Sequence, residues 1–215
     1  MWKQYQVAQQ RIKKELRRVV GRGGFRQHHS ATSNLLQSKT QGLPAALQPD
    51  CNEVYLLHGT GPDVIINLLS GGANERFSGG LFGHGTYFAE DASKNDQYVT
   101  SDRSFGQHRE LHDLIYADNM PCHPNSRIFY LLLCRVMLGA VVRTRDGHSN
   151  LDGGGGGCFV NGQQRELAIV PNSSPPVHFH SLLAETGGRI ARHREFIVFH
   201  GNYIYPEYLL AYERK

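Results

Sequence analysis

Residues 79–90 read Gly-Gly-Leu-Phe-Gly-His-Gly-Thr-Tyr-Phe-Ala-Glu, with four glycines in the first seven positions. A glycine-rich loop is flexible and lets a ligand come close to the backbone, so we expect a lid over a flat ligand. The loop runs straight into an apolar segment, which predicts a strand at 86–88. The Gly-x-Gly-x-x-Gly order that opens a helix in dinucleotide-binding folds is absent, which argues against a Rossmann phosphate site.

Short β-like runs separated by turns extend in both directions from this stretch. Two short helices are expected at 64–69 and 92–98. The spacing favours an α+β fold with a mainly antiparallel sheet. The candidate strands lie at 54–57, 86–88, 128–137, 167–170, 196–199 and 208–212.

The first fifty residues differ from the rest in pattern and charge. Apolar residues recur at near-helical spacing over residues 1–20, which predicts an amphipathic helix, and 26–50 resembles a polar connector. We therefore expect a basic helix and connector at 1–50 and a catalytic domain at 51–215. Residues 1–26 hold eight Lys or Arg against one acid, a net charge of +7, which leaves −3 for the remainder. Such a helix can touch nucleic acid, but a solvated face explains it as well.

The overall composition is that of a globular protein. Of the 215 residues 40% are hydrophobic and 20% charged, which argues against a disordered chain. No apolar run is long enough to span a membrane, and the polar, charged N-terminus has no hydrophobic stretch that could serve as a secretory signal. The four cysteines have no paired spacing, so we expect free thiols and an intracellular location, cytoplasmic or nuclear. The five glycines at 153–157 predict a mobile surface loop.

Five residues other than the glycines of 79–90 suggest chemistry. His58, at the end of a predicted strand, can offer a ring nitrogen to a hydroxyl group, and Gly59 lets a ligand reach the backbone, although a His-Gly turn is often only structural. Tyr87 and Tyr98 can stack on a planar ring from two sides, or they can be core residues. Glu195 is costly to bury in an apolar strand unless it is paired or used; the alternative is a solvated strand edge.

Taken together, these motifs closely resemble the catalytic domain of the poly(ADP-ribose) polymerase family, which belongs to the diphtheria-toxin-like ADP-ribosyltransferases. The C-terminal motif is most like the tankyrases and the short mono-ADP-ribosylating members. The lead-in helix is similar to that of members without a helical autoinhibitory subdomain. The motifs that carry the resemblance are His58-Gly59-Thr60, 82–90, Ser93-Lys94-x-x-Gln97-Tyr98, Glu-Phe-Ile-Val-Phe at 195–199 and Tyr-Pro-Glu-Tyr-Leu-Leu at 205–210.

The resemblance implies two packed antiparallel sheets, the ADP-ribosyltransferase catalytic fold, with a cleft that binds NAD as substrate. The His-Tyr-Glu signature of the family falls on His58, Tyr87 and Glu195. The histidine then holds the adenosine ribose, with Thr60 beside it, and the tyrosine lines the nicotinamide ribose.

On the nicotinamide side, the resemblance places the amide on the Gly59 backbone and the ring on Tyr98. Asn95 stands where the family usually has a serine hydroxyl for the nicotinamide amide, and the glycine loop looks shorter than in the tankyrases. Both differences bear on affinity for nicotinamide and its analogues.

Tankyrases carry a zinc site beside this cleft, and its matching region here offers four potential ligands. The matching Cys-x-x-Cys is absent and a cysteine next to a histidine suits one tetrahedral ion poorly, so a metal-free insertion is favoured. The four residues are His108, His112, Cys122 and His123.

The expected function is transfer of ADP-ribose from NAD to a protein acceptor, the chain itself included, with release of nicotinamide. Glu195 is suited to a ribosyl cation-like transition state, which needs fixed negative charge. Its presence permits chain elongation without deciding between one unit and a polymer. The alternatives are a silent module that binds NAD or ADP-ribose and transfer to nucleic-acid ends.

Overall fold

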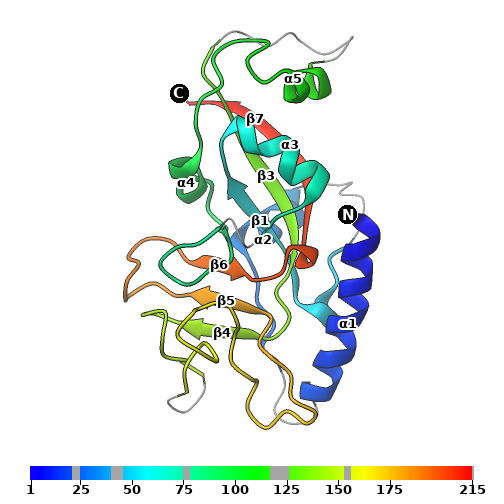
Figure 1. Cartoon of the computed structure of the whole chain (residues 1–215), viewed down its shortest axis with the longest axis vertical. Coiled ribbons are helices and arrows are strands. Elements are labelled where there is room, and N and C mark those ends of the chain that lie inside the picture. The colour runs from blue at the N-terminus through cyan, green and yellow to red at the C-terminus, as the bar shows by residue number, and fades with distance from the viewer. Residues whose placement is uncertain (21–24, 40–45, 75–77, 117–125, 153–155, 215) are drawn as a thin grey trace.

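A computed structural model describes all residues except 21–24, 40–45, 75–77, 117–125, 153–155 and 215. Its described strands form two sheets that lie one above the other in Figure 1. The upper sheet has the order β1-β3-β7 and the lower sheet the order β2-β6-β5-β4. The strands are β1 (Glu53–Gly59), β2 (Thr86–Phe88), β3 (Ile128–Met137), β4 (Val141–Thr144), β5 (Ser181–Ala184), β6 (Glu195–Val198) and β7 (Ile204–Glu213).

All strand pairs are antiparallel except β4 with β5. A backbone bridge between Leu57 of β1 and Ala89, just after β2, joins the two sheets. Phe88 and Phe196 of the lower sheet share a buried cluster with Leu56 and Leu132 of the upper sheet. The predicted α+β fold with two packed, mainly antiparallel sheets is therefore confirmed.

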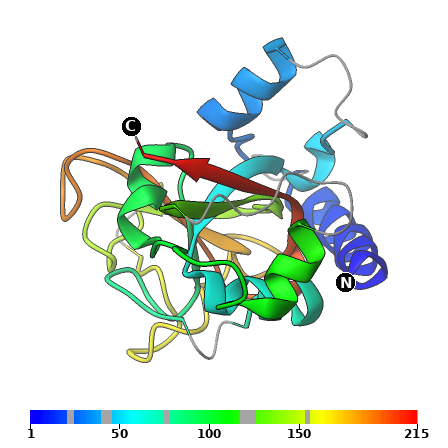
Figure 2. The ribbon, with the colours of Figure 1, turned by 90° about the horizontal axis from the view of Figure 1, so that it is seen from above.

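The short helices cover the upper sheet on both faces, as Figure 2 shows. Leu36 of one helix packs against Tyr55 and Leu133 on one face, and Ile65 and Leu111 pack on the other. The helical segments after the first are α2 (Ala31–Lys39), η1 (Pro49–Cys51), α3 (Pro62–Gly71), α4 (Ala92–Asn95), η3 (Asp96–Tyr98), α5 (Arg109–Ile115) and η4 (Gly201–Tyr203).

The N-terminal helix α1 (Trp2–Val20) is amphipathic, as its spacing predicts. Its apolar face belongs to the same core cluster as the strands. The phenol of Tyr5 donates a hydrogen bond of 2.5 Å to the Glu53 carboxylate. The helix thus shares a core with residues after position 50, and the division at that position stays a prediction of organisation. The buried residues of the face are Tyr5, Ala8, Ile12, Leu16 and Val19.

A buried arginine holds the middle of the upper sheet together. Arg135 is 2% exposed, and its guanidinium contacts the carboxylate of Glu53 at 3.2 Å and that of Glu207 at 2.9 Å. It also donates to the Tyr55 hydroxyl at 3.0 Å. A buried guanidinium needs such partners because its desolvation is costly, and here they come from β1 and β7, the two strands that flank β3.

Two predictions about local structure are wrong. The connector at 26–50 contains the helix α2, whose nine residues show little amphipathic pattern. Residues 167–170 form no strand, because only Leu167 and Ile169 make isolated bridges. The glycine run at 153–157 falls mostly outside the described residues.

Across the described part of the chain, no helix is both long and apolar enough to span a bilayer. Cys51, Cys134 and Cys158 are free and buried, as the cysteine spacing predicts, whereas Cys122 lies outside the described residues.

Candidate active site

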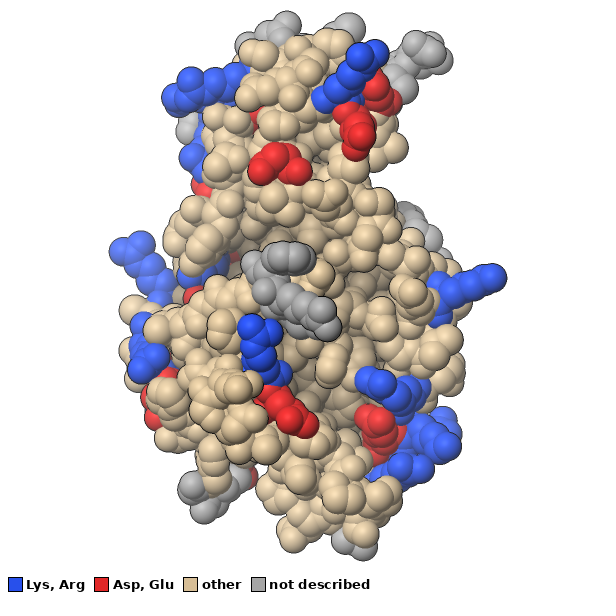
Figure 3. All heavy atoms as spheres, viewed as in Figure 1, with Lys and Arg blue, Asp and Glu red and all other residues tan. Residues whose placement is uncertain are grey.

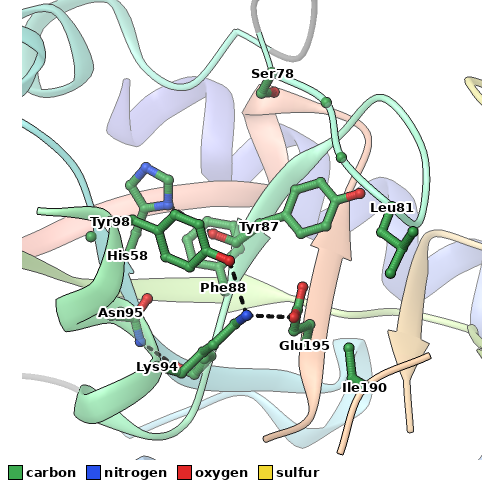
Figure 4. A pocket seen from close by; sticks show the side chains of 14 residues that line it. His58, Ser78, Leu81, Tyr87, Phe88, Lys94, Asn95, Tyr98, Ile190 and Glu195 are labelled. Carbon is green, nitrogen blue, oxygen red and sulfur yellow. Dashed lines mark hydrogen bonds and ion pairs between the residues drawn. The ribbon is translucent and has the colours of Figure 1, made fainter. Parts of the chain in front are cut away.

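A cavity of about 450 Å³ lies where the ends of β1 and β2 meet the start of β6 and the helix α4 (Figure 4). It brings together five of the six residues that the sequence singles out for substrate binding, and the predicted catalytic glutamate. The lining residues are His58, Gly59, Ser78, Gly79, Gly80, Leu81, Tyr87, Phe88, Ala89, Lys94, Asn95, Tyr98, Ile190 and Glu195.

His58 is held at the end of β1 by the strand beside it. Its Nδ1 lies 2.8 Å from the backbone oxygen of Tyr87. A carbonyl oxygen can only accept, so Nδ1 carries the proton and Nε2 keeps its lone pair. Burial lowers the pKa of His58 below its ordinary value, which favours the neutral ring. The imidazole therefore presents an acceptor to a ligand hydroxyl.

Gly59 is required for the close approach of β1 and α4. A Cβ atom at this position would lie 2.3 Å from the backbone oxygen of Asn95 and 3.2 Å from Cγ1 of Val99. Asn95 is itself buried, and its Nδ2 donates to the Asp91 oxygen at 2.9 Å. The amide nitrogen is thus used within the protein, and the amide oxygen is turned toward the cavity in Figure 4.

Tyr87 anchors the glycine loop through its hydroxyl. The hydroxyl accepts from the Phe82 amide at 2.8 Å and donates to the Gly83 oxygen at 2.9 Å. Burial raises the pKa of Tyr87 to about 12, so the phenol stays protonated. A Cβ at Gly80 would lie 2.8 Å from the tyrosine ring, which explains the glycine there. The loop is therefore pinned over the cavity, a role that sequence reasoning did not assign to Tyr87.

Glu195 points into the cavity from the first position of β6 (Figure 4). It is 7% exposed, and its Oε1 lies 2.8 Å from Nζ of Lys94. The solvated-edge interpretation is therefore wrong, because the carboxylate is buried and paired. The Lys94 ammonium also donates to the Tyr98 hydroxyl at 3.0 Å.

Lys94 was not among the predicted site residues. Lys94 belongs to the Ser-Lys-x-x-Gln-Tyr motif, but the spacing within that motif does not predict that its side chain contacts a strand about 100 residues later. Tyr98, its other partner, is 60% exposed and lines the cavity, and the Lys94 ammonium lies over its ring, 5.0 Å from the centroid.

A second ion pair joins two residues that directly follow and precede lining residues of the cavity, Ala89 and Glu195. Arg194, which precedes the glutamate, forms a two-pronged contact with Glu90, with Nε–Oε1 2.7 Å and Nη2–Oε2 2.9 Å. The amide of Ala31, at the start of α2, donates to the same carboxylate at 2.7 Å. The unpredicted helix α2 is thereby tied to Glu90, three residues after Tyr87, and through Glu90 to Arg194, which directly precedes Glu195.

Two predicted features fall outside this arrangement. Thr60 lies one residue beyond β1 and is not among the described residues that line the cavity. Ser78 does line it, although no pattern marked it, and its buried Oγ has no hydrogen-bond partner among the described residues.

The candidate zinc ligands are only partly described. His112 Nε2 lies 2.6 Å from the Asp102 carboxylate, and its Nδ1 accepts from the Gly106 amide at 2.8 Å, so both ring nitrogens are in use. Cys122 and His123 lie outside the described residues. The side chains that are described contain no group of three or more that could hold a metal ion.

Comparison with known families agrees with this geometry. The family model of the poly(ADP-ribose) polymerase catalytic domain matches residues 14–214. The chain belongs to the poly(ADP-ribose) polymerase family. Among its curated relatives within this family are the proteins named Protein mono-ADP-ribosyltransferase PARP11 from Mus musculus and from Homo sapiens. Each is 24% identical over 168 residues, or 76% of this chain. The matched region covers 43% of the mouse protein and 42% of the human one, so the chain spans less than half of either.

Proposed function

We propose that this chain transfers ADP-ribose from NAD, the substrate of this family, to a side chain of a protein acceptor and releases nicotinamide. The observation that carries the proposal is the position of Glu195. Its buried carboxylate lies in one cavity with an imidazole acceptor, two tyrosines and a glycine-rich loop. A dinucleotide needs such a mixture of polar groups and flat apolar surface.

The residues divide into a binding set and a catalytic group. His58 Nε2 accepts a hydrogen bond from the adenosine ribose, whereas Thr60, which does not line the cavity, is given no contact with the substrate. The Gly59 backbone and the Asn95 oxygen hold the nicotinamide amide, while Tyr98 stacks on its ring. Tyr87 lines the nicotinamide ribose and keeps the glycine loop over it. These assignments extend the family signature to the present cavity.

The reaction breaks the bond between C1′ of the ribose and the ring nitrogen of nicotinamide. The electron pair of that bond stays on the nitrogen, so nicotinamide leaves as a neutral molecule and C1′ becomes cation-like. A nucleophilic atom of the acceptor then bonds to C1′ and loses its proton to a base or to solvent. Glu195 stabilises the positive charge, orients the ribose by accepting from its 2′-hydroxyl, and polarises the acceptor.

Lys94 has a positioning role in this scheme. Its ammonium holds the Glu195 carboxylate at 2.8 Å and the Tyr98 hydroxyl at 3.0 Å, so one side chain links the catalytic group to the stacking ring. Preorganisation of this kind lowers the reorganisation needed in the transition state.

The test is incubation of the protein with NAD, alone and with an added mixture of proteins, followed by intact-mass spectrometry and measurement of released nicotinamide. We expect a mass increase by whole ADP-ribose units. Glu195→Gln should slow the transfer about 100-fold or more. Glu166→Gln, an exposed acid outside the cavity, serves as the matched control. A gel smear, in place of a discrete shift, would indicate a polymer.

Three outcomes contradict the proposal. Binding of NAD without any mass increase would indicate a silent NAD-binding module. Modification of added oligonucleotide ends with no protein modification would indicate a nucleic-acid acceptor. Unchanged transfer by Glu195→Gln, with its melting temperature preserved, would remove the carboxylate from the mechanism.

A further inference from the structure

A second feature lies just outside the cavity, on the loop that connects β5 to β6. This loop, residues 185–194, leads directly into Glu195, and its Ile190 lines the cavity. Arg189 and Arg192 of the loop are exposed, and so is Arg145, which follows β4. We call these three residues the arginine edge. They lie at the side of the lower sheet where the parallel strands β4 and β5 both end.

The loop is held against the end of β4 by its backbone. The Arg189 amide donates to the Arg145 oxygen at 2.9 Å, and the Gly187 amide donates to the Ile190 oxygen at 3.0 Å. A Cβ at Gly188 would lie 2.4 Å from the same Arg145 oxygen, so only glycine permits this contact. The positions of Arg145 and Arg189 are therefore fixed relative to each other and to Ile190 in the cavity wall.

The loop carries two more basic residues, and both are already paired. Arg194 contacts Glu90, and the ring of His193 lies 3.3 Å from the Asp91 carboxylate. In contrast, the guanidinium groups of the arginine edge have no ion pair or hydrogen bond to any described residue. These three cations are available to a ligand.

Nearby acids reduce the positive charge of the edge only in part. Asp146 follows Arg145, and its carboxylate accepts from the amides of His148 and Ser149 at 2.8 Å. These bonds hold the pKa of Asp146 well below its usual range, so its negative charge persists. Glu185 and Asp152 share the guanidinium of Arg143, which leaves one further negative charge beside the edge. The edge thus keeps a net charge of about +1, in a chain that is net negative after residue 26.

Figures 1 and 2 place the β5–β6 loop at the left side of the molecule and α1 at the opposite side. In Figure 3, Lys and Arg side chains project at the left side, beside the region of this loop. The basic face of α1 is therefore a separate surface, and it offers a control for charge alone.

We propose that the arginine edge binds an Asp- and Glu-rich segment of the acceptor protein and so brings the acceptor side chain to Glu195. This inference rests on the proposed transferase function and names the class of its acceptor. Guanidinium forks match carboxylates in shape and charge. Nucleic acid fits the edge less well, because residues 185–194 contain no Phe, Tyr or Trp on which a base could stack. The arginine edge binds the acceptor protein and orients its side chain. The bonds that break and form are those described above for the cavity.

The test uses two synthetic peptides with the same central cassette of Ser, Lys, Arg, Cys and one Glu. One peptide carries runs of Asp on both sides, and the other carries Asn. Fragmentation mass spectrometry counts ADP-ribose on the cassette only, so added carboxylates are not counted as acceptors. We expect about a tenfold preference for the Asp peptide at low salt, and a weaker preference at high salt.

The variant R189Q/R192Q should modify the Asp and Asn peptides about equally, and R145Q should reduce the preference for the Asp peptide in part. Release of nicotinamide from NAD in the absence of peptide should not change in either variant, which also shows that the cavity is intact. The matched control R17Q/R18Q removes two exposed cations from α1 and should keep the preference.

The outcomes separate the two proposals. If the wild type modifies both peptides equally, or if R189Q/R192Q keeps the full preference, the arginine edge does not select the acceptor, and the transferase function stands. If the wild type neither releases nicotinamide nor modifies any protein or peptide, the transferase function itself is wrong. Equal losses in R189Q/R192Q and R17Q/R18Q would show that net charge, not this edge, is responsible.

Discussion

The ion pair between Glu90 and Arg194 should couple the stability of the fold to the position of the catalytic glutamate. We would change each residue to glutamine, singly and together. Glu90→Gln keeps an oxygen for the Ala31 amide, so it removes the charge without removing the contact to α2. Because Arg194 precedes Glu195, loss of the pair should loosen the start of β6, where the Glu195 side chain meets Lys94.

The expected magnitude follows from the geometry. At a separation of about 2.8 Å and an effective dielectric constant of about 20, the gross attraction is roughly 6 kcal/mol. Desolvation of both groups offsets most of this, since the side chains are only 31% and 15% exposed. Two charge-assisted hydrogen bonds leave about 2 kcal/mol of net coupling, which corresponds to a change in melting temperature of about 4 to 8 °C in a domain of this size.

A double-mutant cycle in urea measures this coupling energy directly. The pair between Glu166 and His178, at 3.7 Å with both side chains more than 40% exposed, is the control and should show almost no coupling. The rate of ADP-ribose transfer at saturating NAD should fall in both single variants, with a smaller change in KM. A coupling energy below about 0.5 kcal/mol would refute the reasoning, because the contact would then be no stronger than an exposed surface pair.

Three further predictions concern single positions. Gly59→Ala should lower the free energy of unfolding by about 1 to 3 kcal/mol in urea and weaken NAD binding, because its Cβ would meet the Asn95 oxygen; unchanged values would show that β1 and α4 separate freely. Ser78→Ala should raise KM for NAD about fivefold at an unchanged melting temperature, since its buried hydroxyl is available to the substrate; an unchanged KM would show that the hydroxyl makes no contact. Burial lowers the pKa of His28 to about 4, whereas in the unfolded chain it is near 6.5, so protons favour the unfolded state between these values. The free energy of unfolding should therefore fall by about 1 to 2 kcal/mol from pH 7 to pH 5, and His28→Gln should remove that part of the pH dependence.

The long elements could be predicted from local sequence. Residues 128–137 are almost entirely apolar, which indicates a strand buried on both faces, and all ten residues of β3 are buried. Helix α1 followed from its periodic apolar residues. The strands β4 and β5 are four residues each, too short for a pattern to emerge, and they are stabilised by pairing with each other and by the pairing of β5 with β6. Helix α2 shows no clear apolar face and is held instead by contacts such as that of Ala31 with Glu90.

The identities of the cavity residues and their spacing along the chain point to a site without any structure. Clustered glycines, a histidine at a strand end and an acid in an apolar strand are unusual in a chain that only needs to fold. The motif positions, the long strands and the family resemblance therefore follow from the amino-acid sequence alone. It did not determine whether Glu195 faced solvent or ligand. That was decided by the tertiary structure, which places Lys94, from a helix a hundred residues earlier, 2.8 Å from the carboxylate. Burial and partner choice depend on which distant segments pack together, and no local pattern records that information.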